Sequence, residues 1–160
     1  MEHRPDRVVL HHAGVLWKHG DRSRSKIRAL QSWGQREKGW PDLPYHFLLD
    51  PEGTIYEGRE MRFRPESNTQ YDLTGAINVH LWGDFDQQRV SLPQLRSTVE
   101  LLAWLADQWQ LQKVTTHCQE APGQTTCPGY DLLRYLDSGT LQDWVQQQRA
   151  GASPVVECFP

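Results

Sequence analysis

The sequence has no apolar run long enough to cross a membrane and no apolar segment near its start that would direct export. We therefore expect a chain made in the cytoplasm, without a signal peptide or a transmembrane segment. Basic residues are not in excess either, because the formal net charge is −3 and the isoelectric point is about 6.1. Neither a nucleic acid nor an anionic membrane is therefore an expected partner. A glycine-rich phosphate-binding loop is also missing, which argues against a nucleotide-binding fold.

Cysteine is scarce, since the chain has three: Cys118, Cys127 and Cys158. Three is an odd number and too few for the disulfide framework of a small secreted domain. In an oxidising compartment Cys118 could pair with Cys127. In a reducing one, Cys127 stays available as a metal ligand or as a packed thiol.

Hydrophobic residues make up 38% of the 160 residues and charged residues 23%, as in an ordinary globular protein that forms one domain. Strand and helix patterns alternate without strict βαβ order, so we expect an α/β (α+β) single domain with a central mixed β-sheet flanked by helices. We expect this domain to cover residues 1–149 and residues 150–160 to form a flexible C-terminal tail. The expected strands are 7–11, 45–49, 54–57, 76–81 and 113–116, and the expected helices are 23–38, 91–109, 129–136 and 141–149.

Two of the expected helices have recognisable ends. Ser91 is a suitable N-cap for the longest helix, and Ser23 or Ser25 is one for the first helix, which should end at Gly39. Basic residues gather in and around this first helix, over residues 18–38. We interpret them as a solvated helix face rather than as a ligand-binding strip.

The stretch Val114–Tyr130 places His117 and Cys127 on either side of a turn-rich loop. Imidazole and thiolate both bind zinc well, but a catalytic zinc needs a third protein ligand and an open position for water. The first strand ends in His11 and His12, whose side chains point to opposite faces, so one of the two could be the third ligand. The chemistry of these residues supports a zinc hydrolase and a metal-free, packed cluster equally.

Four motifs carry a resemblance to a known family: VVLHHAG, LPYHFLLDPEGTIYEGR, GAINVHLWGDF and THCQEAPGQTTCPGYDL. In this order and at these separations, they resemble the zinc-dependent N-acetylmuramoyl-L-alanine amidases of the second amidase family. That family shares its fold with peptidoglycan recognition proteins and with a small phage amidase. The resemblance covers roughly residues 7–136. It implies a peptidoglycan recognition protein-like fold, in agreement with the mixed sheet expected above.

The resemblance also implies roles for individual residues. The family's first two zinc ligands fall on His11 and His117, and Cys127 matches the third ligand of the recognition-protein and phage branch. Tyr45 matches the tyrosine that catalytic members place beside the metal, where it would stabilise an oxyanion. Thr125 resembles the recognition-protein branch at a position where the phage branch has lysine. One Zn²⁺ per chain is therefore implied, with Tyr45 and Thr125 as catalytic residues.

Substrate contacts are expected from side chains near these motifs, with aromatic rings for the sugar and arginines for the carboxylates of the stem peptide. Packing is the alternative for the aromatic residues, and solvation is the alternative for the arginines. Glu120 lies in the ligand loop but is expected at the surface, so no general base is identified. The expected substrate-binding residues are Trp40, Tyr71, Trp82, Arg62 and Arg64.

The implied reaction is hydrolysis of the amide bond between N-acetylmuramic acid and L-alanine of the peptidoglycan stem peptide. The central strand lacks the glutamate of cytosolic recycling amidases, so a cell-wall-degrading enzyme of the phage endolysin or antibacterial effector type is expected. Such an enzyme, unless it is the mature form of an exported protein, reaches the periplasm after release or delivery by another system. The expected partners of this monomer are peptidoglycan or muropeptides, and an inhibitor or immunity protein in the effector case. The alternatives are a non-catalytic peptidoglycan-binding module and a structural zinc site closed by Cys118.

Overall fold

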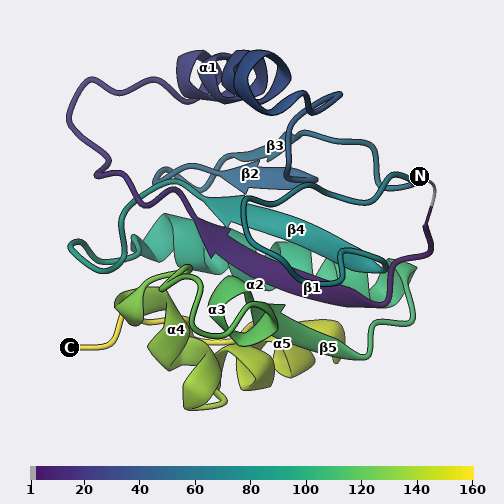
Figure 1. The fold of residues 1–160 in the computed structure, drawn as a ribbon. Helices are drawn as coiled ribbons and strands as arrows, with labels where there is room; N and C mark the ends of the chain where they lie inside the picture. Colours follow the sequence, from purple (N-terminus) through teal and green to yellow (C-terminus); the bar gives the residue numbers. More distant parts are fainter. Residues whose placement is uncertain (1–2) are drawn as a thin grey trace.

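Five strands form one mixed sheet at the centre of the protein, whose computed structural model describes residues 3–160 (Figure 1). The sheet has the spatial order β3-β2-β4-β1-β5. Neighbouring strands are parallel except β2 and β3, which form the expected antiparallel hairpin. The predicted fold class is confirmed, and each expected strand is present. The strands are β1 (Arg7–His12), β2 (Phe47–Leu49), β3 (Ile55–Glu57), β4 (Ala76–Leu81) and β5 (Lys113–Thr116).

Helices cover both faces of this sheet (Figure 1). On one face lies α1 (Ser23–Trp33), which continues into a π-helical turn, η1 (Gly34–Lys38). On the other face pack α2 (Leu92–Gln108), α4 (Tyr130–Asp137) and α5 (Thr140–Arg149), all three as predicted. The short α3 (His117–Glu120), which follows β5 directly, was not predicted. Among residues 3–160, no helix combines the length and the apolar composition that crossing a bilayer requires.

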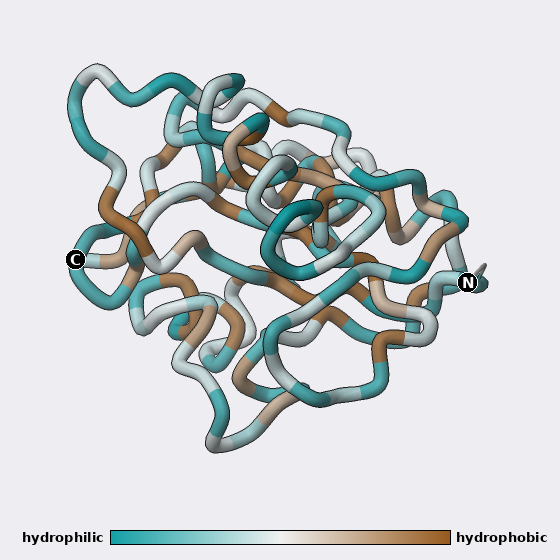
Figure 2. The backbone as a smooth tube through the Cα atoms, turned by 45° about the horizontal axis from the view of Figure 1, so that its top comes forward, coloured by the Kyte–Doolittle hydropathy of each residue, from teal (hydrophilic) through white to brown (hydrophobic). Residues whose placement is uncertain are grey.

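The two faces of the sheet differ in chemical character because successive side chains of a strand point to opposite sides. Toward α2, α4 and α5 the strands present aliphatic residues such as Leu10 and Val79, which form the main core. The alternate residues include the equally buried but polar His11, Asn78 and His80, beside apolar residues such as Leu48 that pack toward α1. In Figure 2 the hydrophobic stretches run through the interior, and the outer loops are hydrophilic. The polar face is therefore the one that can hold a reactive site.

The first helix differs from its prediction. Its N-cap is Arg22, which makes no side-chain capping bond, so the cap predicted at Ser23 or Ser25 is wrong. The Ser23 hydroxyl donates instead to the Asp50 carboxylate (2.7 Å). The α-helix ends at Trp33, and the Gly34 carbonyl then accepts hydrogen bonds from Gly39 and Trp40, which widens the last turn. Gly39 closes the turn with φ of 67°, as predicted.

Residues 150–160 contain no helix or strand and lie against the body of the protein. Val156 is buried, and the ring of Phe159 stacks on Tyr135 with centroids 4.2 Å apart. The N–H of Phe159 also donates to the Tyr135 hydroxyl (2.8 Å). The flexibility expected of this segment stays a prediction.

Candidate metal centre

Three side chains from distant parts of the sequence meet at one edge of the sheet. One ligand atom each of His11, His117 and Cys127 lies within 4.8 Å of the other two, and all three residues belong to one buried cluster. Cys127 Sγ is 3.8 Å from His11 Nδ1, and the two imidazole rings have centroids 4.5 Å apart. Among residues 3–160, no fourth histidine, cysteine or carboxylate joins them. Three donors converge, as a catalytic metal site requires.

The register of the sheet brings the two histidines together. β1 and β5 are parallel neighbours in which Leu10 pairs with Thr116, so the residues that follow this pair, His11 in β1 and His117 at the start of α3, lie side by side. Their side chains emerge on the polar face, where the loop of residues 59–75 covers them. The carboxyl ends of parallel strands thus place both imidazoles at the same edge.

Backbone hydrogen bonds hold Cys127 in position. The N–H of His12 donates to Cys127 Sγ (3.3 Å), and the N–H of Cys118 donates to the Cys127 carbonyl (2.7 Å). The Cys127 N–H donates to the Thr125 hydroxyl (3.0 Å). Burial raises the pKa of the Cys127 thiol to about 12, so only a cation at the cluster would keep it a thiolate at neutral pH.

Both histidines are suited to bind a cation. Burial lowers the pKa of His117 to about 4 and that of His11 well below its usual value, so both rings are neutral at neutral pH. His117 Nε2 lies 2.5 Å from the Thr69 hydroxyl and 3.3 Å from the Ser67 hydroxyl, which leaves Nδ1 free for a ligand. Two neutral imidazoles and one thiolate form a donor set that fits Zn²⁺.

His12 does not belong to this cluster. Its Nδ1 accepts a hydrogen bond from the Phe85 N–H (3.1 Å), so its ring lies on the side of the main core. Ligand atoms of His12, Asp84 and Asp86 also approach one another within 4.8 Å. A neutral imidazole whose Nδ1 accepts a hydrogen bond carries its proton on Nε2, which leaves no lone pair for a metal there. Of the two histidines that end β1, His11 is the metal-ligand candidate.

Tyr45 lies beside the cluster on the polar face. Its ring centroid is 5.2 Å from that of His11 and 4.4 Å from that of His80. Burial raises the pKa of the Tyr45 phenol, so the hydroxyl stays protonated and can donate a hydrogen bond. Thr125 uses its oxygen to accept the Cys127 N–H, which leaves its hydroxyl hydrogen free to donate.

A cleft opens directly onto the cluster. Tyr45 and the two histidines form part of its wall, and Trp40, one of the expected substrate residues, forms another part. The Trp33 ring meets the Trp40 ring edge-on at 5.7 Å. Five of the residues that line the cleft were not expected from the sequence: Trp33, Pro44, Glu66, Ser67 and Asn68.

The other expected substrate residues differ in where they lie. The Tyr71 ring is 5.6 Å from that of His117, so Tyr71 does border the cluster. Trp82 is buried between the sheet and α1 and does not line the cleft. Arg62 bonds to Glu60 (2.8 Å) and stacks on Phe63, and neither Arg62 nor Arg64 lines the cleft.

Glu120 is also placed away from the cleft. Its carboxylate pairs with Arg7 (3.2 Å) and with Lys113 (2.8 Å), so it ties β1 and β5 together.

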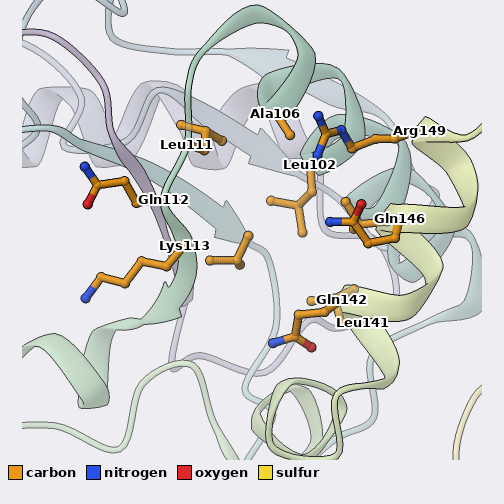
Figure 3. A pocket seen from close by; sticks show the side chains of 11 residues that line it. Leu102, Ala106, Leu111, Gln112, Lys113, Leu141, Gln142, Gln146 and Arg149 are labelled. Carbon is orange, nitrogen blue, oxygen red and sulfur yellow. The ribbon is translucent and has the colours of Figure 1, made fainter.

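Another groove lies between α2, α5 and β5, on the main-core side of the sheet. In Figure 3 aliphatic side chains such as Leu102 and Leu141 point into this groove, and glutamines such as Gln142 and Gln146 stand at its rim. No histidine, cysteine or acidic residue lines it, so it offers no group for hydrolytic chemistry.

Solved structures that share this fold include peptidoglycan amidases and peptidoglycan recognition proteins. The chain belongs to the N-acetylmuramoyl-L-alanine amidase family, whose model matches residues 1–130. The resemblance noted in the sequence is thereby confirmed.

Individual relatives fall into the same two groups. The chain is 28% identical to the endolysin of Escherichia phage T7 over 120 residues, which are 72% of this chain and 77% of the endolysin. It is 23% identical to peptidoglycan-recognition protein SC2 of Drosophila simulans over 139 residues, 86% of this chain and 74% of the relative.

Among solved structures, the amidase LysC from Clostridium intestinale has a TM-score of 0.72 at 22% identity, covering 88% of this chain and 87% of LysC. A Drosophila PGRP-LB mutant has a TM-score of 0.73 at 22% identity, with 86% and 82% covered. At these identities, the structures support the fold.

Proposed function

We propose that this protein is a zinc-dependent amidase that hydrolyses the bond between N-acetylmuramic acid and L-alanine of the peptidoglycan stem peptide. The observation that carries the proposal is the convergence of His11, His117 and Cys127 beside a cleft that His11, His117 and Tyr45 line, with the Tyr45 ring centroid 5.2 Å from that of His11. Family membership supplies the class of substrate. An endolysin or effector that acts on peptidoglycan after release or delivery by another system is the proposed setting.

Each residue of the site has a distinct task. His11, His117 and Cys127 would hold one Zn²⁺, which when bound supplies a Lewis acid for the amide carbonyl and activates a water molecule. Tyr45 donates a hydrogen bond to the carbonyl oxygen as that oxygen gains negative charge. Thr125, whose oxygen is already used by the Cys127 N–H, can donate its hydroxyl hydrogen to the same oxygen.

The cleft walls suit the parts of the substrate on either side of this bond. Trp33 and Trp40 offer aromatic faces and edges of the kind that pack against sugar rings. Ser67 and Asn68 offer hydrogen-bonding groups for the peptide. Glu66 brings a carboxylate to the cleft wall, where it pairs with Arg59 (3.5 Å), so neither Glu66 nor the paired Glu120 is assigned as the proton acceptor for the attacking water.

A peptidoglycan-binding module without catalysis is the second candidate, because the relatives include recognition proteins. The donor set favours the enzyme, since all three ligand candidates and Tyr45 are present. A structural zinc site is disfavoured, because Cys118 Sγ lies 3.4 Å from the Thr116 hydroxyl and is not a member of the cluster.

Incubation with purified Gram-negative peptidoglycan, followed by mass spectrometry of the soluble products, tests the proposal. We expect free stem peptides that begin at L-alanine, which disappear with a chelator and return with added zinc. Intact muropeptides under every condition, from protein that still binds peptidoglycan, would instead establish the binding module.

A further inference from the structure

Positive charge is concentrated on α1 and η1. Residues 22–38 contain six of the 17 arginine and lysine residues of the chain but one of its 20 acidic residues, Glu37. Five of these cations are exposed, and none of the five forms an ion pair with another residue of the range 3–160. We call these five the basic strip: Arg22, Arg24, Arg28, Arg36 and Lys38.

The basic strip weakens the helix that carries it. Arg24 and Arg28 are four residues apart on α1, and like charges at this spacing destabilise a helix. The strip also begins at the helix N-terminus, where the helix dipole favours negative charge. α1 has no acidic residue in its first turn and no side-chain cap. Residues that destabilise the helix in which they lie are expected mainly at functional surfaces. The arginines of the basic strip are therefore not explained by a contribution to stability.

The basic strip is continuous with the cleft. Trp33, the last residue of α1, lines the cleft together with His11 and His117. Lys38 lies over the Trp33 ring, 5.4 Å from its centroid. The residues that line the cleft include Glu66 but no lysine or arginine. The basic strip therefore begins at the cleft, next to Trp33, and extends along α1 away from it.

We propose that the basic strip, which the sequence alone led us to interpret as a solvated helix face, docks the anionic peptidoglycan strand from which the cleft takes its stem peptide. Stem peptides carry carboxylates and recur along the glycan, so the polymer presents negative charge at several places beyond the bond that is cut. Guanidinium groups bind carboxylates through paired hydrogen bonds, and weak exposed pairs add up along a polymer. The strip raises affinity for the polymer and takes no part in the reaction. The identity of the polymer rests on the proposed function.

The variant Arg24→Gln/Arg28→Gln tests this docking. Glutamine is a good helix former, so the double variant removes two charges and keeps the helix. The matched control, Arg4→Gln/Arg96→Gln, removes the same charge from two exposed arginines outside α1 and η1 that form no ion pair with another residue of the range 3–160. Sedimentation with intact sacculi at low and high salt measures binding, and turnover of a soluble muropeptide measures the reaction. We expect the strip variant to bind sacculi about fivefold more weakly at low salt and to depend less on salt than the wild type, because three of the five cations remain. The control should bind like the wild type, and all three should turn over the soluble muropeptide equally.

Several outcomes would overturn the proposal. The proposal is wrong if the wild type and the strip variant bind sacculi equally well. It is also wrong if the control variant loses as much binding as the strip variant, because net charge would then be the cause. Strip-dependent binding to phosphatidylglycerol vesicles, with unchanged binding to sacculi, would assign the strip to a lipid surface. Binding does not require hydrolysis. A wild type that binds sacculi through the strip but releases no stem peptide would therefore contradict the amidase and leave the docking in place.

Discussion

Cys127 belongs to the cluster and Tyr45 lies beside it, so substitutions of the two residues are expected to have different effects. Cys127→Ala removes a donor atom, so both bound zinc and hydrolysis should be lost. Tyr45→Phe keeps the ring against His11 and His80 and removes the hydroxyl, so zinc should stay bound while kcat falls about 10²–10³-fold. Metal analysis beside turnover of a muropeptide separates the two effects. A Cys127→Ala protein with bound zinc and full activity would contradict the ligand set.

Thr69 is expected to orient the His117 ring. When Nδ1 binds the metal, Nε2 carries the proton and donates it to the Thr69 hydroxyl, 2.5 Å away. Thr69→Val, which keeps the shape of the side chain, should weaken zinc binding about 10–100-fold, and Thr69→Ser should restore it. Competition with a chelator of known affinity measures the change. Ser67→Ala is the control with a smaller expected effect, because Ser67 lies farther from Nε2, at 3.3 Å. Unchanged affinity in Thr69→Val would show that another group orients the ring.

The sequence reveals the three ligand candidates because their chemistry is rare and their positions, at strand ends and in one loop, are regular. It does not reveal Thr69, Ser67 or Glu66, because the loop of residues 59–75 has no periodicity. Their contacts depend on how this loop lies over the sheet. Trp82 was expected at the substrate on the strength of its place in a motif, but packing against α1 decides its position.

Among the structural elements, the loop that carries Cys127 depends on a carboxylate from another loop. Asp86 accepts hydrogen bonds from the Thr126 hydroxyl (2.8 Å) and from the Tyr130 N–H (2.9 Å), one on each side of Cys127. Asp86→Ala should speed amide hydrogen exchange in residues 121–130 and weaken zinc binding. Asp86→Asn can accept from Tyr130 and donate to the Thr126 oxygen, so it should resemble the wild type. Equal exchange in Asp86→Ala and the wild type would show that the loop holds itself.

Helices and strands could be predicted from the sequence where a local feature, such as a capping residue, agrees with the pattern of buried residues. β4 and α2 are such cases, since the Ser91 side chain caps α2 by accepting from the Gln94 N–H (3.2 Å). The turn η1 was not predictable, because it forms where the Trp40 ring packs so closely on Gly34 that a Cβ would lie 2.9 Å from the ring. α3 spans four residues, which is too short to leave a periodic pattern.

For the whole molecule, the buried histidines predict loss of stability in mild acid. Burial lowers the pKa of His46 to about 4 and that of His80 to about 3, against about 6.5 in the unfolded chain. Between these values the unfolded chain binds more protons, so stability is present above pH 6.5 and is lost as the pH falls toward 4. Each such histidine contributes a slope of about 1.4 kcal/mol per pH unit. Denaturant unfolding at pH 7 and pH 5 measures the slope. His46→Gln should reduce it, whereas a variant of the exposed His19 that reduces it equally would contradict the assignment.

The C-terminal segment gives a second prediction at this scale. Deleting residues 154–160 removes the buried Val156 and the Phe159 ring that stacks on Tyr135. Because each apolar side chain of this size contributes roughly 1.5–3 kcal/mol when fully buried, Tm should fall by about 5–10 °C. Calorimetry of the two chains measures the difference. An unchanged Tm would support the flexible tail predicted from the sequence.

The pairing of Leu10 with Thr116 also determines where the chain tolerates a change of length. A residue inserted near the exposed Gln110 would lengthen the connection before β5 and leave the pairing as it is. One residue inserted within Lys113–Thr116 would turn every later side chain of the strand over and send His117 to the face of α2 and α5. The connection before β5 therefore tolerates a change of length, whereas a single added codon within β5 displaces the ligand candidate His117 without changing any residue of the site.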